Sequence, residues 1–408
     1  MALFSTLVLP NGNEIKNRIG KAAMEENMAD ADQAPSEQLY RLYDSWAKGG
    51  SGLIISGNVM VDGRAMTGPG GVVLEDESQL DKFTRWAKIG TQNGAQFWMQ
   101  INHPGRQMPG SLGQEAIAPS AVALDLGAQS GRFPTPRAMT AEDIADIQRR
   151  FTNTAVLAQK AGFSGVQIHA AHGYLLSQFL SPLVNKREDE WGGSLENRAR
   201  LLIDIVKSVR AEVRLDFAVA VKINSADFQR GGFSEDDARQ VVQWLNPLGV
   251  DLIELSGGSY EAPAMMGKAR DERSLAREAY FLDFATEVRK VATMPVMVTG
   301  GVRRIEVANT VIDSGVDMVG IATALAICPD LPKCWKAGET PVPVMRPVKL
   351  KDKALASAAQ MSAVRFQMAK LSKGKRTNPN VWPIYALVTS ELEAKSRAKR
   401  YRSWAATK

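Results

Sequence analysis

The feature that most constrains the fold is a repeated alternation of short apolar runs with longer segments of helical period. Eight runs rich in Val and Ile recur along the chain, at 18–24, 52–59, 95–101, 165–170, 218–224, 251–257, 295–301 and 317–323. Runs of this kind are typical of parallel strands that are buried on both faces. Eight strand–helix units predict an α/β fold, a (β/α)8 TIM barrel, with a doubly wound sheet as the structural alternative.

The segments between these runs carry signals of helix ends. Five glycines stand where helices are expected to stop, at Gly50, Gly94, Gly162, Gly249 and Gly315. The sequence TAED at 140–143 predicts a capping box that opens a helix running to about Lys160, and Ser234 before three acidic residues predicts another helix start. The segments 103–139 and 258–276 are expected to be long loops at the barrel's active-site face.

The last part of the chain breaks the pattern and predicts a helical extension, residues 346–408, after a barrel over residues 1–345. The extension holds 15 Lys/Arg and 3 Asp/Glu, which leaves 35 and 41 for the rest of the chain. Binding of nucleic acid would therefore have to rest on the extension alone. We favour the alternative that Trp382, Tyr385 and Trp404 pack the extension on a barrel or a neighbouring subunit.

Composition narrows the class of protein further. A chain with 45% apolar and 23% charged residues has the profile of a soluble globular protein. It has no apolar run of the ~18–20 residues that a membrane span needs, and its N-terminus is a poor signal peptide because Pro10 interrupts it early. Cys328 and Cys334 are too few for a disulfide framework or a four-thiolate cluster. We expect a cytoplasmic protein.

The stretch IHAAHGY at 168–174 is the strongest chemical signal, because it contains two of only three histidines. His169 and His172 could be structural residues, or they could bind zinc if His103 supplied a third ligand. A third possibility is that both imidazoles donate hydrogen bonds to one substrate oxygen. Tyr174 would then act as a general acid, since a phenol with a pKa of about 10 stays protonated at neutral pH.

Other strand ends also carry groups that need a partner. Gln100 and Lys222 lie within apolar strands, where an unpaired polar group is costly, so both would suit a polar heteroaromatic ring across the barrel mouth. The alternative for Lys222 is a salt bridge to Glu254. Gly300 and Gly301, with Gly320 on the next strand, could let the backbone cradle a phosphate, or could be turn glycines only.

These residues resemble the Old Yellow Enzyme (NADH:flavin oxidoreductase) family of FMN barrels. The similarity spans roughly residues 5–340. Its most specific part is HAAHGYLLSQFLSPLVNKREDEWGGSLENRARLL at 169–202, supported by NRIGKAAM, QINHPGRQ, RAMTAEDI, VKINSADF and VTGGV.

The resemblance implies roles for individual residues. His169 and His172 would hold the substrate carbonyl oxygen, and Tyr174 would donate the proton. The FMN site would be formed by Ala23, Met24, Asn58, Gln100, Lys222, Gly300, Gly301, Gly320, Ala322 and Thr323, and no metal is expected. The implied activity is an ene-reductase that passes hydride from NADH or NADPH through FMN to an activated alkene, such as an α,β-unsaturated carbonyl compound. The alternatives are a flavin dehydrogenase or demethylase acting on a small amine, and a non-catalytic binding protein. The family also implies a homo-oligomer.

The sequence departs from the family pattern in two parts of the predicted site. Glu25 stands where a Cys or Thr beside the flavin is usual, and an ionised carboxylate there would lower the flavin potential unless it points away. Ala322 and Thr323 stand where the family usually has a Gly-Arg pair whose arginine binds the phosphate. Backbone N–H groups and the Thr323 hydroxyl would therefore have to bind the phosphate here.

Overall fold

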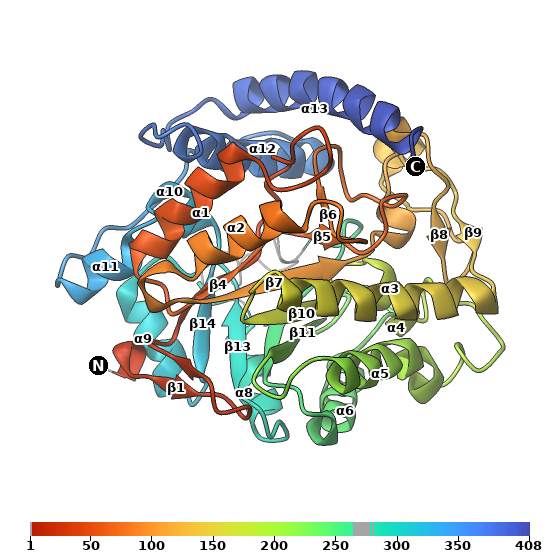
Figure 1. Cartoon of the computed structure of the whole chain (residues 1–408), viewed down its shortest axis with the longest axis horizontal. Helices are drawn as coiled ribbons and strands as arrows, with labels where there is room; N and C mark the ends of the chain where they lie inside the picture. The colour runs from red at the N-terminus through yellow and green to blue at the C-terminus, as the bar shows by residue number, and fades with distance from the viewer. Residues whose placement is uncertain (1, 264–277, 280) are drawn as a thin grey trace.

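A barrel of eight parallel strands forms the centre of the protein, in a computed structural model that describes residues 2–263, 278–279 and 281–408 (Figure 1). The strands are β3 (Ile19–Lys21), β4 (Leu53–Ile55), β7 (Gln96–Asn102), β10 (Gly165–Ala170), β11 (Ala218–Asn224), β12 (Leu252–Ser256), β13 (Val296–Thr299) and β14 (Met318–Ile321). Each strand pairs in parallel with the next one along the chain, and β14 pairs back with β3, so the sheet is closed. Every predicted run contains one barrel strand. The predicted TIM barrel is confirmed, and the doubly wound alternative is wrong.

Helices cover the outside of the barrel and begin and end as their capping residues predict. They are α1 (Glu37–Gly49), α2 (Leu80–Gly90), α3 (Ala141–Lys160), α4 (Leu175–Leu180), α5 (Leu195–Glu212), α6 (Glu235–Leu245), α8 (Leu282–Arg289), α9 (Ile305–Asp313), α10 (Thr323–Ile327) and α11 (Leu331–Lys336). Thr140 and Ser234 form capping boxes at the starts of α3 and α6. All five predicted helix-stop glycines have the left-handed backbone conformation that such positions need.

The barrel interior changes from apolar to polar along the strand direction. At its amino-terminal end, Leu53, Trp98, Leu252 and Met297 pack against a short hairpin made by β1 (Leu7–Val8) and β2 (Glu14–Ile15). Two residues further along β7, β12 and β13, the inward positions carry the polar residues Gln100, Glu254 and Thr299. Polar side chains therefore gather toward the carboxyl ends of these strands, which is the end of a barrel where chemistry usually takes place.

The long segment after β7 is more ordered than a simple loop. Residues 103–139 contain a pair of short parallel strands, β8 (Ile117–Ala118) and β9 (Arg137–Ala138), and three short 3-10 helices. Two further short strands, β5 (Val59–Met60) and β6 (Val72–Val73), extend the sheet beyond β7. The other expected loop, 258–276, lies outside the described residues from position 264 onward.

The predicted extension forms two helices, α12 (Lys353–Leu371) and α13 (Pro383–Ala405), which lie side by side along one edge of the molecule (Figure 1). Tyr401 of α13 is fully buried, and its hydroxyl donates to the Gly63 carbonyl oxygen at 2.8 Å. Trp404 packs beside it, as expected. Trp382 and Tyr385 are 62% and 56% exposed, so they do not pack on the barrel of their own chain, and their packing on a neighbouring subunit stays a prediction. The domain boundary at residue 345 stays a prediction, as does a homo-oligomer.

None of the helices in the described part of the chain is long and apolar enough to cross a bilayer. The cytoplasmic location stays a prediction.

Candidate active site

A chain of hydrogen bonds links polar side chains from five strands, β7, β10, β11, β12 and β13, inside the upper barrel. Gln100 Nε2 donates to Gln167 Oε1, and Gln167 Nε2 donates to Glu254 Oε2, each at 2.7 Å. Lys222 Nζ and Thr299 Oγ1 donate to the other oxygen of Glu254 at 2.7 and 2.8 Å. The parallel register explains the chain, because it sets Gln100 beside Gln167 and Lys222 beside Glu254.

Lys222 therefore forms the salt bridge to Glu254 that the sequence offered as an alternative to binding a ligand. Both side chains are buried, Lys222 at 4% and Glu254 at 0% exposure. The salt bridge does not use all the hydrogen-bond donors of the lysine, because an ammonium group has three N–H donors and Glu254 accepts from one of them. A ligand at the barrel mouth can use the remaining donors, so the ion pair and the predicted ligand role are compatible.

His169 and His172 lie at the end of β10 with their rings 5.1 Å apart. The Ala171 backbone N–H donates to His169 Nδ1 at 3.2 Å, which places the proton of a neutral imidazole on Nε2. His172 has a left-handed backbone with φ 61°, and its own N–H donates to Asn224 Oδ1. Its Nε2 lies 2.8 Å from Ser256 Oγ, and a serine proton donated there leaves the histidine proton on Nδ1.

Tyr174 completes this group, with its ring 5.0 Å from that of His169. Its hydroxyl lies 3.0 Å from the hydroxyl of Tyr260, which comes from the loop after β12. The sequence motif therefore brings two imidazoles and a phenol together, and the fold adds a second phenol from a distant segment.

Burial sets the protonation states of these groups. Burial lowers the pKa of both histidines well below the usual value, and the Lys222 ammonium lowers each further, so both are neutral at physiological pH. Burial raises the pKa of Tyr174 well above its usual value, and Tyr260 and the Glu25 carboxylate raise it further. Burial likewise raises the pKa of Tyr260 to about 12. The phenols hold their protons until a strong base forms beside them.

The zinc alternative is wrong, because the three histidines do not come together. His103 is buried, with Nδ1 accepting from the Gly105 N–H, and burial lowers its pKa to about 4. Within the described ranges, the one group of three potential metal ligands holds no histidine; it consists of Cys328, Asp330 and Cys334.

The predicted phosphate residues lie at the ends of β13 and β14. Gly301 has a left-handed backbone with φ 76°, which favours glycine. Gly320 has a packing role of its own, because a Cβ atom there would lie 1.9 Å from Thr299 Oγ1. Ala322 and Thr323 start α10, where the first N–H groups of a helix have no intrahelical acceptor. These observations leave phosphate binding by the backbone as a prediction.

Three further predicted ligands lie near the ends of β3 and β4. Ala23 packs against the apolar barrel interior, and the Met24 carbonyl oxygen lies against Gly57. Asn58 lies beside Tyr174, where its side chain lowers the pKa of the phenol. Its Oδ1 atom is buried without a hydrogen-bond partner among the described residues. An unpaired buried acceptor indicates a missing donor.

The open groups at the barrel mouth fit a flavin. Lys222 has free N–H donors for the oxygen side of the pyrimidine ring. Gln100 Oε1 accepts no hydrogen bond from any residue that the structure describes, so it can accept one from the imide N–H. Asn58 adds the unpaired acceptor. The residues present thus offer both donors and acceptors to a polar ring system.

Sequence reasoning missed several residues of this site. Gln167 was detectable, since it is a polar residue on the inward side of an apolar strand, two positions before His169. Glu254 was considered only as a salt-bridge partner of Lys222, and its link to Gln167 and Thr299 was not anticipated. Tyr260 carried no signal, because its loop gives no periodicity and its contact with Tyr174 depends on the closed barrel.

Comparison with known proteins identifies the family. The profile of the NADH:flavin oxidoreductase / NADH oxidase family matches residues 2–340. The chain is 38% identical over 349 residues to the NADH-dependent flavin oxidoreductase iliE of Hypocrea jecorina (strain QM6a), covering 80% of this chain and 87% of the relative. It is 37% identical over 360 residues to the NADH-dependent flavin oxidoreductase iccE of Talaromyces variabilis, covering 81% and 85%.

A solved structure agrees with these matches. The old yellow enzyme homologue from Zymomonas mobilis superposes with a TM-score of 0.72 at 26% identity, covering 84% of this chain and 95% of that one. The chain therefore belongs to the NADH:flavin oxidoreductase / Old Yellow Enzyme family and is an NADH-dependent flavin oxidoreductase.

Proposed function

We propose that the flavin is FMN and that the enzyme reduces an alkene activated by a carbonyl or nitro group. The observation that carries this proposal is the group of two neutral imidazoles and a protonated phenol at one strand end. Such a group can bind an oxygen that becomes negative during reaction and can supply one proton. Reduction of an activated alkene needs both.

FMN, when bound, would supply the hydride chemistry, taking hydride from NADH or NADPH and passing it to the β-carbon. Lys222, Gln100 and Asn58 would hold its ring. Gly300 and Gly301, with Gly320, Ala322 and Thr323, would hold its phosphate.

The protein would provide the charge stabilisation and the proton. His169 Nε2–H and His172 Nδ1–H would donate to the substrate oxygen, and fixed donors of this kind lower a barrier by about 3–4 kcal/mol each. Ser256 and Asn224 would hold His172 in place. Tyr174, whose hydroxyl lies 3.0 Å from that of Tyr260, would then give its proton to the α-carbon.

The test separates the two half-reactions. Tyr174→Phe should slow alkene reduction by roughly 10²–10⁴-fold, the usual worth of a general acid, and should leave flavin reduction by NADH unchanged. Tyr385→Phe is a matched control, because that tyrosine is exposed on α13. Equal loss in both half-reactions would contradict the role of Tyr174. Release of the flavin by denaturation and its chromatography would show whether it is FMN. Reduction of the flavin by an amine without NADH would favour the dehydrogenase alternative.

A further inference from the structure

Glu25, the residue that departs from the family pattern, is paired with an arginine of the extension. Its Oε1 accepts from Thr67 Oγ1 at 2.5 Å, and its Oε2 accepts from Arg365 Nη2. Both side chains of the ion pair are largely shielded from solvent, Glu25 at 17% and Arg365 at 24% exposure. Partial burial makes such a pair stronger than a surface salt bridge.

The extension holds Arg365 in this position through independent contacts. On α13, Arg400 donates to the Ala29 carbonyl oxygen at 3.1 Å, and Arg402 donates to the Ser111 carbonyl oxygen at 2.5 Å. Together with buried Tyr401, these contacts fix α13 on the loops that follow β3, β5 and β7. Since α12 packs along α13 (Figure 1), the guanidinium of Arg365 is supplied by a docked element rather than by a free tail.

The ion pair is within electrostatic reach of the phenol pair. The Glu25 carboxylate raises the pKa of both Tyr174 and Tyr260, whereas Arg365 lowers that of Tyr260. A carboxylate without its arginine would therefore oppose the negative charge that forms on a phenol, on the substrate oxygen or on a reduced flavin.

We propose that Arg365 makes the C-terminal extension a working part of the active site of its own chain, by neutralising Glu25 beside Tyr174 and Tyr260. Arg365 is a positioning and charge-compensating residue. The inference rests on the proposed function insofar as Tyr174 is the proton donor.

The test is a double-mutant cycle on the flavin-loaded enzyme. In Arg365→Gln the uncompensated Glu25 should lower the flavin midpoint potential and slow alkene reduction on the order of tenfold, the effect of one pKa unit. Glu25→Gln/Arg365→Gln should recover most of both losses, and Arg365→Lys should keep both near the unmodified enzyme. Glu391→Gln, which breaks an exposed ion pair between α13 and Arg132, is the matched control and should change neither.

The midpoint potential distinguishes this inference from the proposed function, because it needs no substrate. A potential that shifts in Arg365→Gln and recovers in the double variant would support the inference even if Tyr174 proved dispensable. An unchanged potential and alkene rate in Arg365→Gln would overturn it. The same loss with and without Glu25 would also overturn it, since Arg365 would then act on something else.

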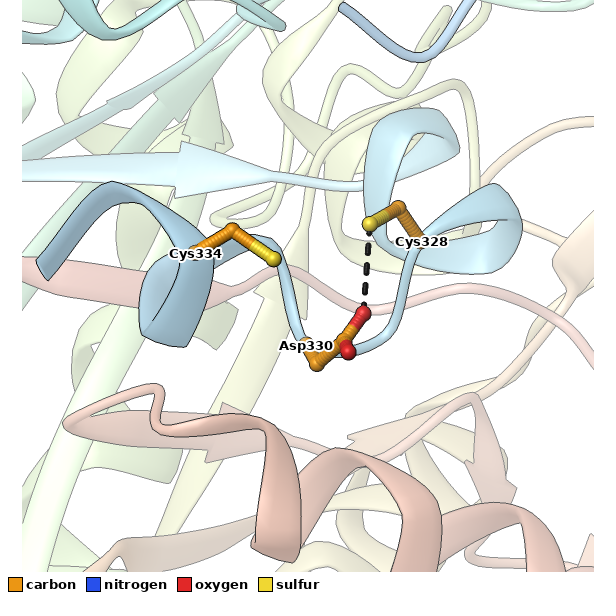
Figure 2. Close-up of side chains that lie close together, drawn as sticks. All are labelled: Cys328, Asp330 and Cys334. Atoms are coloured by element: carbon orange, nitrogen blue, oxygen red, sulfur yellow. Dashed lines mark hydrogen bonds between the residues drawn. The ribbon is translucent and has the colours of Figure 1, made fainter. Parts of the chain in front are cut away.

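A different observation carries a second inference, away from the barrel mouth. Figure 2 shows Cys328, Asp330 and Cys334 facing one another where α10 passes into α11. Cys328 Sγ donates to Asp330 Oδ1 at 3.2 Å, and the three possible ligand atoms all lie within 4.8 Å of one another. Ligand atoms around tetrahedral zinc lie about 3.5–3.8 Å apart, so small side-chain rotations would suffice to form a site.

The surroundings of this cluster also favour a cation. Burial raises the pKa of the Cys334 thiol, and the Asp330 and Glu339 carboxylates raise it further. The Glu339 N–H donates to the Cys334 carbonyl oxygen at 2.9 Å. Over the residues described, neither Asp330 nor Glu339 forms a salt bridge with a lysine or arginine. Two thiols and two carboxylates thus gather, and neither carboxylate has an ion-pair partner among the described residues, although Lys333 and Lys336 lie on the same helix as Cys334. We infer that this cluster binds zinc or a similar thiol-binding divalent ion.

The experiment compares metal content and intact mass. Protein purified under reducing conditions, incubated with zinc and then dialysed, should retain one zinc per chain. Cys328→Ser/Cys334→Ser should retain none while binding flavin normally. Zinc absent from the unmodified protein would overturn the inference. So would an intact mass about 2 Da below the reduced value in unmodified protein purified without reductant, since that would assign the two thiols to a disulfide.

Discussion

Lys222→Met is the substitution that tests the buried ion pair most directly. It removes the ammonium but leaves Glu254 fully buried, with only Gln167 and Thr299 as donors. Breaking a buried pair from one side costs about 3–5 kcal/mol, because the remaining charge loses its ion-pair partner. With an unfolding entropy of ~2.1 cal/mol/K per residue, that loss corresponds to a melting temperature lower by roughly 5 °C.

The matched variant is Lys222→Met/Glu254→Gln, which removes both charges and keeps the side-chain volumes similar. A buried pair replaced as a unit is often neutral for stability, so this variant should unfold close to the unmodified protein. The measurement is urea unfolding of the flavin-free protein, because bound flavin would add its own stabilisation.

Flavin affinity then separates the two roles of the lysine. If Lys222 binds the flavin directly, the double variant regains stability but still binds FMN on the order of tenfold more weakly, the worth of one charged hydrogen bond. Wild-type affinity in the double variant would show that Lys222 serves only Glu254. A loss of less than 1 kcal/mol in Lys222→Met would refute the reasoning on the buried pair itself.

Three further predictions follow from single contacts. Tyr260→Phe removes a group that raises the pKa of Tyr174, so the alkaline limb of the pH–rate profile for alkene reduction should move to lower pH. Gly320→Ala should cost about 1–3 kcal/mol in urea unfolding, because its Cβ would meet Thr299 Oγ1, and Thr299→Ala in the same chain should relieve that cost. His103 has a folded pKa of about 4, below its unfolded value of ~6.5. The neutral His103 therefore contributes its full share to the free energy of unfolding above pH 6.5, and about 3 kcal/mol of that free energy is lost as the pH falls from 6.5 through 4. In His103→Gln the free energy of unfolding should depend less on pH over this range.

The sequence by itself determined the barrel and half of the site. Eight apolar runs and their capping residues are local signals, and they predicted the number of strands and their order along the chain. The pairing of β14 with β3 is what excluded the doubly wound sheet. The group of His169, His172 and Tyr174 was also readable, because three residues within six positions at the end of one strand stay close together in any fold that keeps the strand.

Tertiary structure decided what lies opposite these residues. Whether Lys222 would meet Glu254 depended on the register between β11 and β12, which no local pattern reports. Tyr260 reaches Tyr174 across 86 residues, and Arg365 reaches Glu25 across 340. Such contacts arise only when a closed sheet and a docked extension bring distant segments together. Hydrophobic periodicity and helix capping involve residues a few positions apart in the sequence, so the sequence reports them directly. Charge compensation depends on the distance between side chains in the folded protein, which the sequence does not report.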